Sequence, residues 1–226
     1  MDLDHPDLDK ACFGKLAAED VASQGNPHDC VVHKIDQFKT ELADPDTPKK
    51  EQLLALQFLL HFVGDVHQPL HASTHVDSDT GNEDFGGNCV GILHGRATVP
   101  VRLHAYWDTN LVQKALGKDV DEAADTVSQL LTKANIQKWS GGTASDWATE
   151  SFQIAKGKVY AGAIDQEPEQ TDFEFKDRHG KPDTRCGPSK VFRVDANYDD
   201  RAVAVVKEQI AKAGLRLARL LQEALE

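Results

Sequence analysis

The sequence predicts an all-α protein, and three observations lead to this prediction. Segments with apolar residues at helical spacing recur along most of the chain and are long enough to form helices. Two polar segments rich in Gly, Asp, Ser, Thr and Pro, residues 72–100 and 165–190, read as long loops between them. No domain linker, internal repeat or low-complexity tract interrupts the sequence, so we expect one domain over residues 1–226.

The first two helices are expected before the first long loop. Residues 30–42 have an apolar residue at every third or fourth position, which predicts an amphipathic helix. In the turn that follows, Thr47 is the expected N-cap and Pro48 the first helical residue. This second helix is expected to run to about Gln68, because Pro69 cannot continue it.

The remaining helices are expected after the first long loop. Apolar residues at helical spacing predict helices over residues 104–116, 119–138, 145–162 and 197–225. The apolar stripe of the last segment indicates a helix of the core rather than a cofactor or partner site. One short extended piece is expected inside the first loop, near residues 90–93.

The charge balance excludes a protein that binds nucleic acid through a basic surface. The chain has 25 Lys and Arg against 37 Asp and Glu, which gives a net charge of −12. If it handles a polyanion, metal ions are the obvious source of positive charge, and the ten His residues make that worth pursuing. No apolar run approaches the roughly 18 residues of a membrane span, and the start lacks the basic and apolar regions of a secretory signal.

The most informative segment is LLHFVGDVHQPLH at residues 59–71. His61 and Asp65 are four positions apart, so on a helix both side chains leave the same face, as two ligands of one metal ion would. His71 follows the helix end at Pro69 and is expected to fold back toward the same cavity. Because a carboxylate buried among imidazoles is unfavourable without a compensating cation, this combination indicates a metal site.

A second segment, LHAYWD at residues 103–108, repeats the spacing with His104 and Asp108. One such pair alone would be interpreted as a surface ion pair, but two pairs with a further His between them favour metal ligation. Zinc is the first choice, because mixtures of imidazole and carboxylate suit it and a catalytic zinc site keeps one position open.

In this order, LLHFVGDVHQPLH, the FGGN segment at residues 85–88 and LHAYWD resemble the zinc-dependent single-strand nucleases of the S-one and P-one type. CVVHKIDQF at residues 30–38 and AGLRLARLLQEAL at residues 213–225 are also similar to that family. The resemblance runs over almost the whole chain. It implies the single-domain helical fold that these nucleases share with bacterial zinc phospholipase C.

The resemblance also implies a role for each expected ligand. His61 resembles a ligand of the first zinc, and Asp65 resembles the catalytic carboxylate that bridges this zinc to its close neighbour. His71, His104 and Asp108 resemble the complete protein ligand set of the remaining zinc. An intact family member is thus expected to hold three zinc ions, and this chain one full site and one partial site.

Two further residues are expected to contact the substrate. Phe85 falls where the family has an apolar contact to the nucleobase, and Asn88 is expected beside the metal site. Arg102 stands where the family usually has Asn before Leu-His, so the hydrogen bonding around it is expected to differ.

The resemblance does not include the start of the family domain. The family's N-terminal Trp ligand, its Trp-Ala-Asp motif and its Trp-His-Phe or Trp-His-Tyr motif have no counterpart here, and residues 1–4 resemble the stretch that follows them. The first helices of the family domain are therefore expected to be missing, and the chain as given is expected to be weakly active or inactive.

The activity implied is hydrolysis of single-stranded DNA and RNA to 5′-nucleotides by metal-activated water, with 3′-nucleotidase activity. The expected partners are single-stranded nucleic acid and nucleotides, and the chain is expected to be a monomer. Two alternatives stay open: a zinc phospholipase C-like lipid phosphodiesterase, and a non-catalytic zinc-binding remnant.

The four cysteines permit three pairings or four buried thiols, and the sequence alone does not choose among them. Because bacterial relatives are exported to an oxidising compartment, the resemblance implies a periplasmic or secreted protein. Cys12 is then expected to pair with Cys30, with Cys89 and Cys186 either free or joined. His67 is interpreted as a residue that supports a ligand or bonds the helix end.

Overall fold

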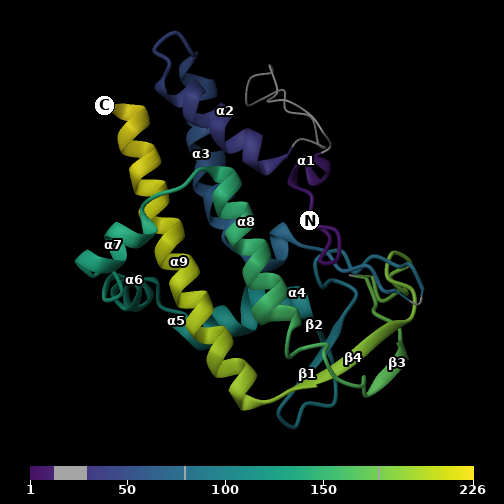
Figure 1. Ribbon diagram of the computed structural model, residues 1–226. Helices are drawn as coiled ribbons and strands as arrows, with labels where there is room; N and C mark the ends of the chain where they lie inside the picture. Colours follow the sequence, from purple (N-terminus) through teal and green to yellow (C-terminus); the bar gives the residue numbers. More distant parts are fainter. Residues whose placement is uncertain (13–29, 79, 178) are drawn as a thin grey trace. The chain divides into compact units, whose positions relative to one another are not determined.

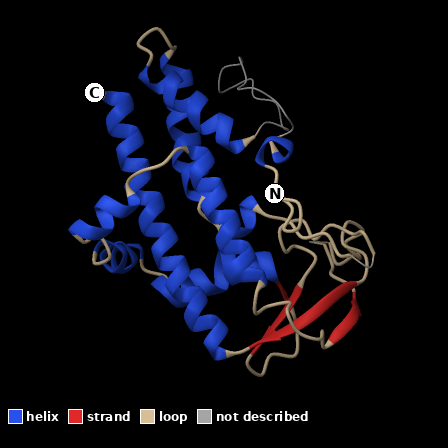
Figure 2. Ribbon diagram, viewed as in Figure 1, coloured by secondary structure: helices blue, strands red, loops and turns tan. Residues whose placement is uncertain are grey.

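The computed structural model describes residues 1–12, 30–78, 80–177 and 179–226. Most of these residues are helical, as the sequence predicts, and the strands gather in one small sheet (Figure 2). The α-helices are α1 (Leu8–Ala11), α2 (Val31–Ala43), α3 (Lys49–Val66), α4 (Leu103–Ala105), α5 (Val112–Leu116), α6 (Val120–Ser128), α7 (Lys133–Trp139), α8 (Ala144–Ile154) and α9 (Ala196–Leu225). A 3₁₀-helix covers Pro69–Ala72, and π-helices cover Tyr106–Leu111 and Ala155–Tyr160. The strands are β1 (Gly91–His94), β2 (Val101–Arg102), β3 (Gln170–Phe173) and β4 (Ser189–Val194) (Figure 1).

The chain forms two compact units whose segments alternate along the sequence. The first unit comprises Met1–Pro6, Gln68–Ala123 and Ser151–Lys207, and the second comprises Asp7–His67, Ala124–Glu150 and Glu208–Glu226. The expectation of one domain over residues 1–226 stays a prediction. None of the described helices has the length and apolar character that crossing a lipid bilayer requires.

The first unit contains a mixed four-stranded sheet in the order β2-β1-β4-β3. Strand β1 pairs antiparallel with β2 and parallel with β4, while β3 pairs antiparallel with β4. The close packing of β1 on β4 requires glycine at Gly91, because a Cβ atom there would lie 2.8 Å from Cγ2 of Val191. Only β1 was predicted. The other strands have two to six residues, too few for a clear period-two pattern.

The second unit is built on an apolar core shared by helices far apart in the sequence. Ile35 and Phe38 of α2, Leu59 of α3, Trp147 of α8 and Leu220 of α9 belong to one buried cluster. Trp139 is also buried, as is Trp107 in the first unit, so all three tryptophans are core residues. The apolar stripe of α9 serves the core in the same way.

The expected pairing of Cys12 with Cys30 is confirmed, and Cys89 and Cys186, which the sequence left either free or joined, are joined. Cys12 is bonded to Cys30 within the second unit, and Cys89 to Cys186 within the first. Cys89 comes just before β1 and Cys186 just before β4, so the second bond connects the two long loops beside the sheet.

Three helix boundaries differ from the prediction. Pro48 occupies the N-cap position of α3, so Thr47 is not the cap, and the helix ends at Val66 before the 3₁₀-turn. The single helix expected over residues 119–138 is broken into α6 and α7. The side chain of Thr132 caps α7 by accepting from the backbone of Asn135, and this local cap starts a new helix that periodicity does not reveal.

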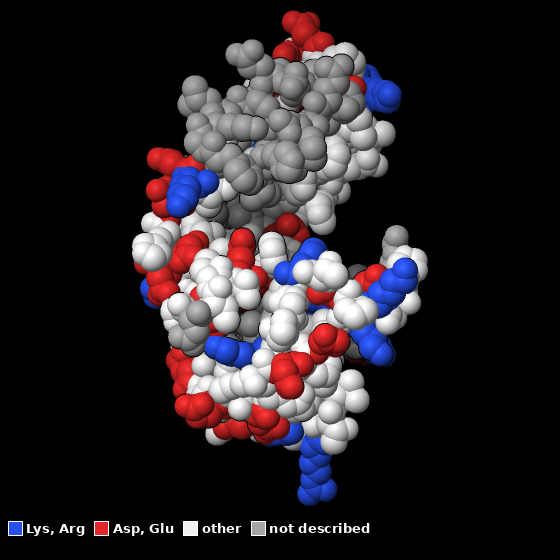
Figure 3. Space-filling view, turned by 90° about the vertical axis from the view of Figure 1, so that its right-hand side faces the viewer, with Lys and Arg blue, Asp and Glu red and all other residues white. Residues whose placement is uncertain are grey.

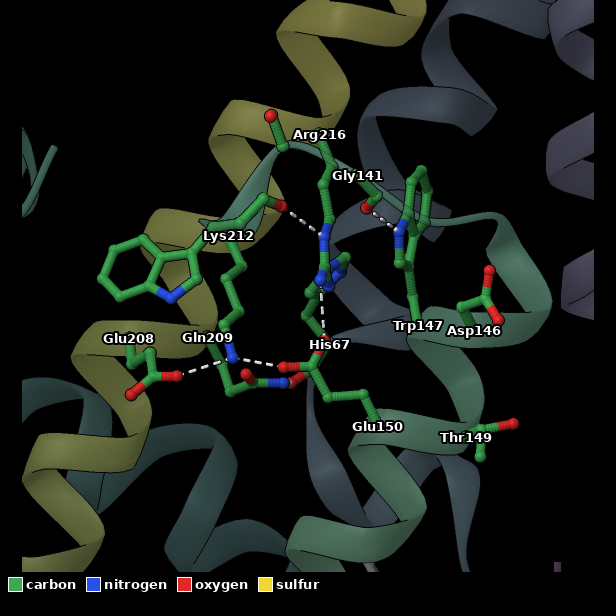
Figure 4. A network of polar contacts seen from close by, with 12 residues as sticks. His67, Gly141, Asp146, Trp147, Thr149, Glu150, Glu208, Gln209, Lys212 and Arg216 are labelled. Carbon is green, nitrogen blue, oxygen red and sulfur yellow. Dashed lines mark hydrogen bonds and ion pairs between the residues drawn. The ribbon is translucent and has the colours of Figure 1, made fainter. Parts of the chain in front are cut away.

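A network of buried polar groups lies inside the second unit (Figure 4). Nδ1 of His67 donates to the carbonyl of Val63 over 2.6 Å, and Nε2 accepts from Arg216 over 2.8 Å. Gln209 donates to the carbonyl of His67 over 3.1 Å. Burial lowers the pKa of His67 to about 4, so the ring is neutral near neutral pH and accepts from Arg216. His67 therefore bonds the end of helix α3, in line with one of its two expected roles.

Candidate metal centre

The 3₁₀-helix Pro69–Ala72 carries His71. The side chain of Gln68 caps this short helix by accepting from the backbone N–H of Leu70 over 2.5 Å. The amide of the same side chain donates to Oδ1 of Asp108 over 2.8 Å. Gln68 thus both caps the turn that carries His71 and holds one oxygen of Asp108. The sequence did not indicate this role.

His104 and Asp108 lie on one continuous helical segment that is not a regular α-helix. The segment passes from α4 into the π-helix Tyr106–Leu111 and then into α5. Nε2 of His104 lies 3.3 Å from Oδ2 of Asp108, and Nε2 of His71 lies 3.5 Å from Oδ1. The two imidazole rings are stacked with centroids 4.9 Å apart. The structure therefore brings three of the five expected ligands together.

The remaining nitrogen of His104 is also bonded. Nδ1 donates to the carbonyl of Gly86 over 2.8 Å, which directs Nε2 toward Asp108. Glycine is required at Gly86, because its φ is +65° and a Cβ atom would lie 2.6 Å from the carbonyl oxygen of Leu70. The Gly86-Gly87 pair in the sequence was the available signal for this close approach.

The electrostatics of the group favour charged forms. Burial alone would raise the pKa of Asp108, but hydrogen bonds from His104, His71 and Gln68 outweigh it and hold the pKa well below its usual range. The hydrogen bond to Asp108 raises the pKa of His104 above its ordinary value against the effect of burial. The carboxylate is therefore ionised, and a cation between these side chains is stabilised by it.

The donor set fits a zinc ion. One ligand atom from each of His71, His104 and Asp108 lies within 4.8 Å of the others. With zinc–ligand bonds of about 2.0–2.1 Å, tetrahedral ligand atoms lie about 3.3 Å apart, close to the observed separations. Among the residues that the structure describes, this is the one group of three His, Cys, Asp or Glu side chains arranged in this way.

His61 and Asp65 lie four residues apart on α3, in the second unit. His61 is exposed and Asp65 is half-buried. Two side chains of this kind are a partial ligand set, as the sequence analysis expects. The structure groups no third described His, Cys, Asp or Glu with them.

The expected substrate residues Phe85 and Asn88 form a tight turn in the first unit. Phe85 has a φ of +52°, which is the left-handed region, and its side chain is 43% exposed. The side-chain amide of Asn88 donates to the carbonyl of Phe85 over 2.9 Å, so Asn88 closes the turn. Gly86 lies in the same turn and its carbonyl accepts from His104, so the backbone that carries this exposed ring also supports His104.

The surface agrees with the acidic composition. On the face drawn in Figure 3, the described Lys and Arg side chains are scattered among Asp and Glu and form no continuous basic patch. Any affinity of this face for a polyanion would need another source of positive charge.

Comparison with known proteins gives consistent matches. The family model described as S1/P1 nuclease matches residues 7–226. The chain is 28% identical over 214 residues to nuclease S1 of Aspergillus oryzae, with 85% of this chain and 61% of that protein covered. It is 27% identical over 216 residues to endonuclease 2 of Arabidopsis thaliana, covering 93% and 67%, and 25% identical over 210 residues to nuclease P1 of Penicillium citrinum, covering 86% and 66%. The match to nuclease S1 thus spans less than two thirds of that protein.

Proposed function

The chain belongs to the S1/P1 nuclease family, and on this premise we propose that it is a zinc-dependent phosphodiesterase of single-stranded DNA and RNA. The products are 5′-nucleotides, and the same site has 3′-nucleotidase activity. Nucleases and endonucleases among its relatives support the hydrolase class. The observation that carries the proposal is the grouping of His71, His104 and Asp108 at separations that suit zinc.

Each residue of this group has a defined task. His104 presents Nε2 because Gly86 holds its other nitrogen, and Asp108 supplies a carboxylate that two imidazoles and Gln68 keep ionised. A zinc ion held by these three side chains would supply positive charge that stabilises a phosphate oxygen. Phe85 offers an exposed ring on which an unstacked nucleobase can lie, which favours single strands.

A separate, partial metal site is proposed on α3. There His61 and Asp65 would hold zinc, and Asp65 would be the catalytic carboxylate. Because the described residues supply two protein ligands here, we expect the 226-residue chain to hydrolyse single-stranded DNA slowly. Two disulfide bonds support placement in the periplasm or outside the cell. The chain is proposed to act as a monomer.

The test is a comparison of substrates with and without metal. The chain is incubated with single-stranded DNA, single-stranded RNA, duplex DNA and phosphatidylcholine vesicles, each with added zinc or with chelator. We expect release of 5′-nucleotides from both single-stranded substrates, loss of activity with chelator, and recovery with zinc. His104→Ala is expected to lower the rate.

Other outcomes would point elsewhere. Hydrolysis of phosphatidylcholine in preference to nucleic acid would favour the phospholipase alternative. Zinc uptake without hydrolysis of any substrate would favour the non-catalytic alternative. Hydrolysis of DNA that chelator does not inhibit would overturn the metal-based proposal, and the His-x-x-x-Asp pairs would then be structural ion pairs.

A further inference from the structure

Arg102 occupies an unusual place in the first unit. It ends strand β2, two residues before His104, and its side chain is only 19% exposed. Nη1 donates to the carbonyl of Asn88 over 2.6 Å and lies 3.4 Å from Sγ of Cys186. Nη2 donates to Asp183 over 2.9 Å. One guanidinium group therefore bonds the turn that carries Phe85 and also the second long loop.

A further contact fixes the plane of this guanidinium group. Its central carbon lies 4.3 Å from the ring centroid of Phe175, which is itself buried. A planar guanidinium group can stack on an aromatic ring while its N–H groups point outward to two acceptors, which an ammonium group cannot do. Asp183, whose side chain is 8% exposed, compensates the charge.

The turn that Arg102 bonds is conformationally strained. Phe85, Gly86 and Gly87 all have positive φ, at +52°, +65° and +79°. For Phe85 this conformation is unfavourable by about 1–2 kcal/mol, so contacts outside the turn must maintain it. Several such contacts are present: Arg102 donates to the carbonyl of Asn88 at the end of the turn, His104 donates to the carbonyls of Gly86 and Gly87, and the disulfide bond anchors the following residue, Cys89.

The turn is connected to the metal ligand through its backbone. Nδ1 of His104 donates to the carbonyl of Gly86, and the backbone N–H of His104 donates to the carbonyl of Gly87 over 3.2 Å. A shift of the turn would therefore move the acceptor that directs Nε2 of His104. The exposed ring of Phe85 lies at the other end of the same turn.

We propose that Arg102 is a positioning residue that holds the Phe85–Asn88 turn, and thereby sets the orientation of His104 for the metal and of the Phe85 ring for a nucleobase. The inference deepens the proposed function and rests on it for the metal and the nucleobase. Arg102 touches neither of them and acts through the carbonyl groups of Asn88 and Gly86.

Arg193 provides a matched control in the same unit. It lies on β4, makes a two-pronged ion pair with Glu169, and donates to the carbonyl groups of Gly95 and Ala97. It thus joins a carboxylate and loop carbonyl groups as Arg102 does, but its loop contains no residue of the proposed site. A role in stability alone predicts similar effects for both arginines.

The experiment compares Arg102→Met, Arg102→Lys and Arg193→Met with the unchanged chain. Two quantities are measured: amide hydrogen exchange in residues 85–88 by mass spectrometry, and zinc affinity by competition with a coloured chelator. For Arg102→Met we expect exchange at least about tenfold faster and zinc affinity about tenfold weaker, the lower end of effects of outer contacts on metal sites. For Arg102→Lys we expect both the exchange rate and the zinc affinity to lie between those of the unchanged chain and Arg102→Met, because one ammonium group cannot reproduce both hydrogen bonds and the stacking. Arg193→Met is expected to change neither quantity.

The outcomes separate the inference from the proposed function. If Arg102→Met leaves exchange unchanged, or speeds it without weakening zinc binding, the inference is wrong and the proposed function stands. Equal effects of Arg193→Met would show a general loss of stability and also overturn it. If the unchanged chain takes up no zinc, the proposed metal site fails and the inference fails with it. Circular dichroism checks that each variant is folded. If Arg102→Met does not fold, the comparison is made with Arg102→Lys instead.

Discussion

Nε2 of His104 lies 3.3 Å from Oδ2 of Asp108, and the backbone between them enters a π-helix at Tyr106. Such wider helical turns are rare and often occur at functional sites. Here the π-helix begins between the two expected ligands, which lie four residues apart on the same helical segment. His71 joins them from a separate 3₁₀-turn.

The metal content of the chain follows from this grouping. After dialysis against metal-free buffer, we expect about one zinc per chain by elemental analysis, because one site has three ligands and the other two. His104→Ala is expected to reduce the value to near zero, whereas His61→Ala is expected to leave it unchanged. A value near three for the unchanged chain would contradict the assignment of a partial site.

Gly86 is expected to be intolerant of a side chain. Gly86→Ala combines an unfavourable φ with a contact of 2.6 Å to the carbonyl oxygen of Leu70. We expect a loss of about 2–3 kcal/mol in the free energy of unfolding and weaker zinc binding. Gly81→Ala is the control, since φ is +70° there and nothing lies within 4 Å, so only about 1 kcal/mol is expected. Equal losses in urea unfolding would show that the contact is relieved by movement.

Glu150 is expected to stabilise the second unit. It pairs with Lys212 and with Arg216, two buried cations that are 5% and 6% exposed. Glu150→Gln leaves both without this carboxylate, and we expect a loss of about 3 kcal/mol in the free energy of unfolding. Glu208 also pairs with Lys212, but its side chain is 42% exposed, so Glu208→Gln is expected to lose at most about 1 kcal/mol. Similar losses for both variants would contradict this ranking.

The same carboxylate is expected to contribute to acid sensitivity. Burial would raise the pKa of Glu150, but hydrogen bonds from Lys212 and Arg216 outweigh it and the pKa lies below its ordinary value. The unfolded chain therefore binds a proton more readily, so this stability is present above the ordinary pKa and is lost as pH falls through the lowered one. We expect Glu150→Gln to flatten the fall in unfolding free energy as the pH drops through the acidic range in which this carboxylate is protonated. The measurements are made with chelator in the buffer to remove effects of bound metal. If Glu150→Gln leaves the pH dependence of the unfolding free energy unchanged, Glu150 does not contribute to acid sensitivity.

The two disulfide bonds are expected to differ in their effect on stability. Cys89 and Cys186 are 97 residues apart, and Cys12 and Cys30 are 18 apart. Because the longer loop loses more chain entropy when it is closed, replacing Cys89 and Cys186 by Ser is expected to cost about 1.5 kcal/mol more than replacing the other pair. Thermal unfolding of the two double variants measures this difference. Thiol titration of the denatured, unreduced chain is expected to find no free thiol.

Local sequence determined the helical character of this protein and the side chains of its candidate metal site. The long apolar stripes predicted α2, α3 and α9 to within a few residues, because helical periodicity is a local property of the chain. The spacing of His104 and Asp108 likewise placed two candidate ligands on one helical segment. The resemblance added an expected role for each of these residues, which stays a prediction, while the match over residues 7–226 bears out the family.

Tertiary structure alone decided the features that depend on distant partners. The sheet forms because β1 pairs with β4, about one hundred residues later in the chain. Strands this short are not stable alone, and their sequences carry no clear strand pattern. The grouping of His71 with His104 and Asp108 also depends on distant contacts. Gln68, beside the turn of His71, donates to Asp108, and the carbonyl of Gly86 accepts from His104. Arg102 read in the sequence as a departure from a family pattern. Only the tertiary structure shows what its side chain does. The guanidinium group stacks on Phe175 and donates to Asn88 and Asp183, which are up to 95 residues apart in the chain.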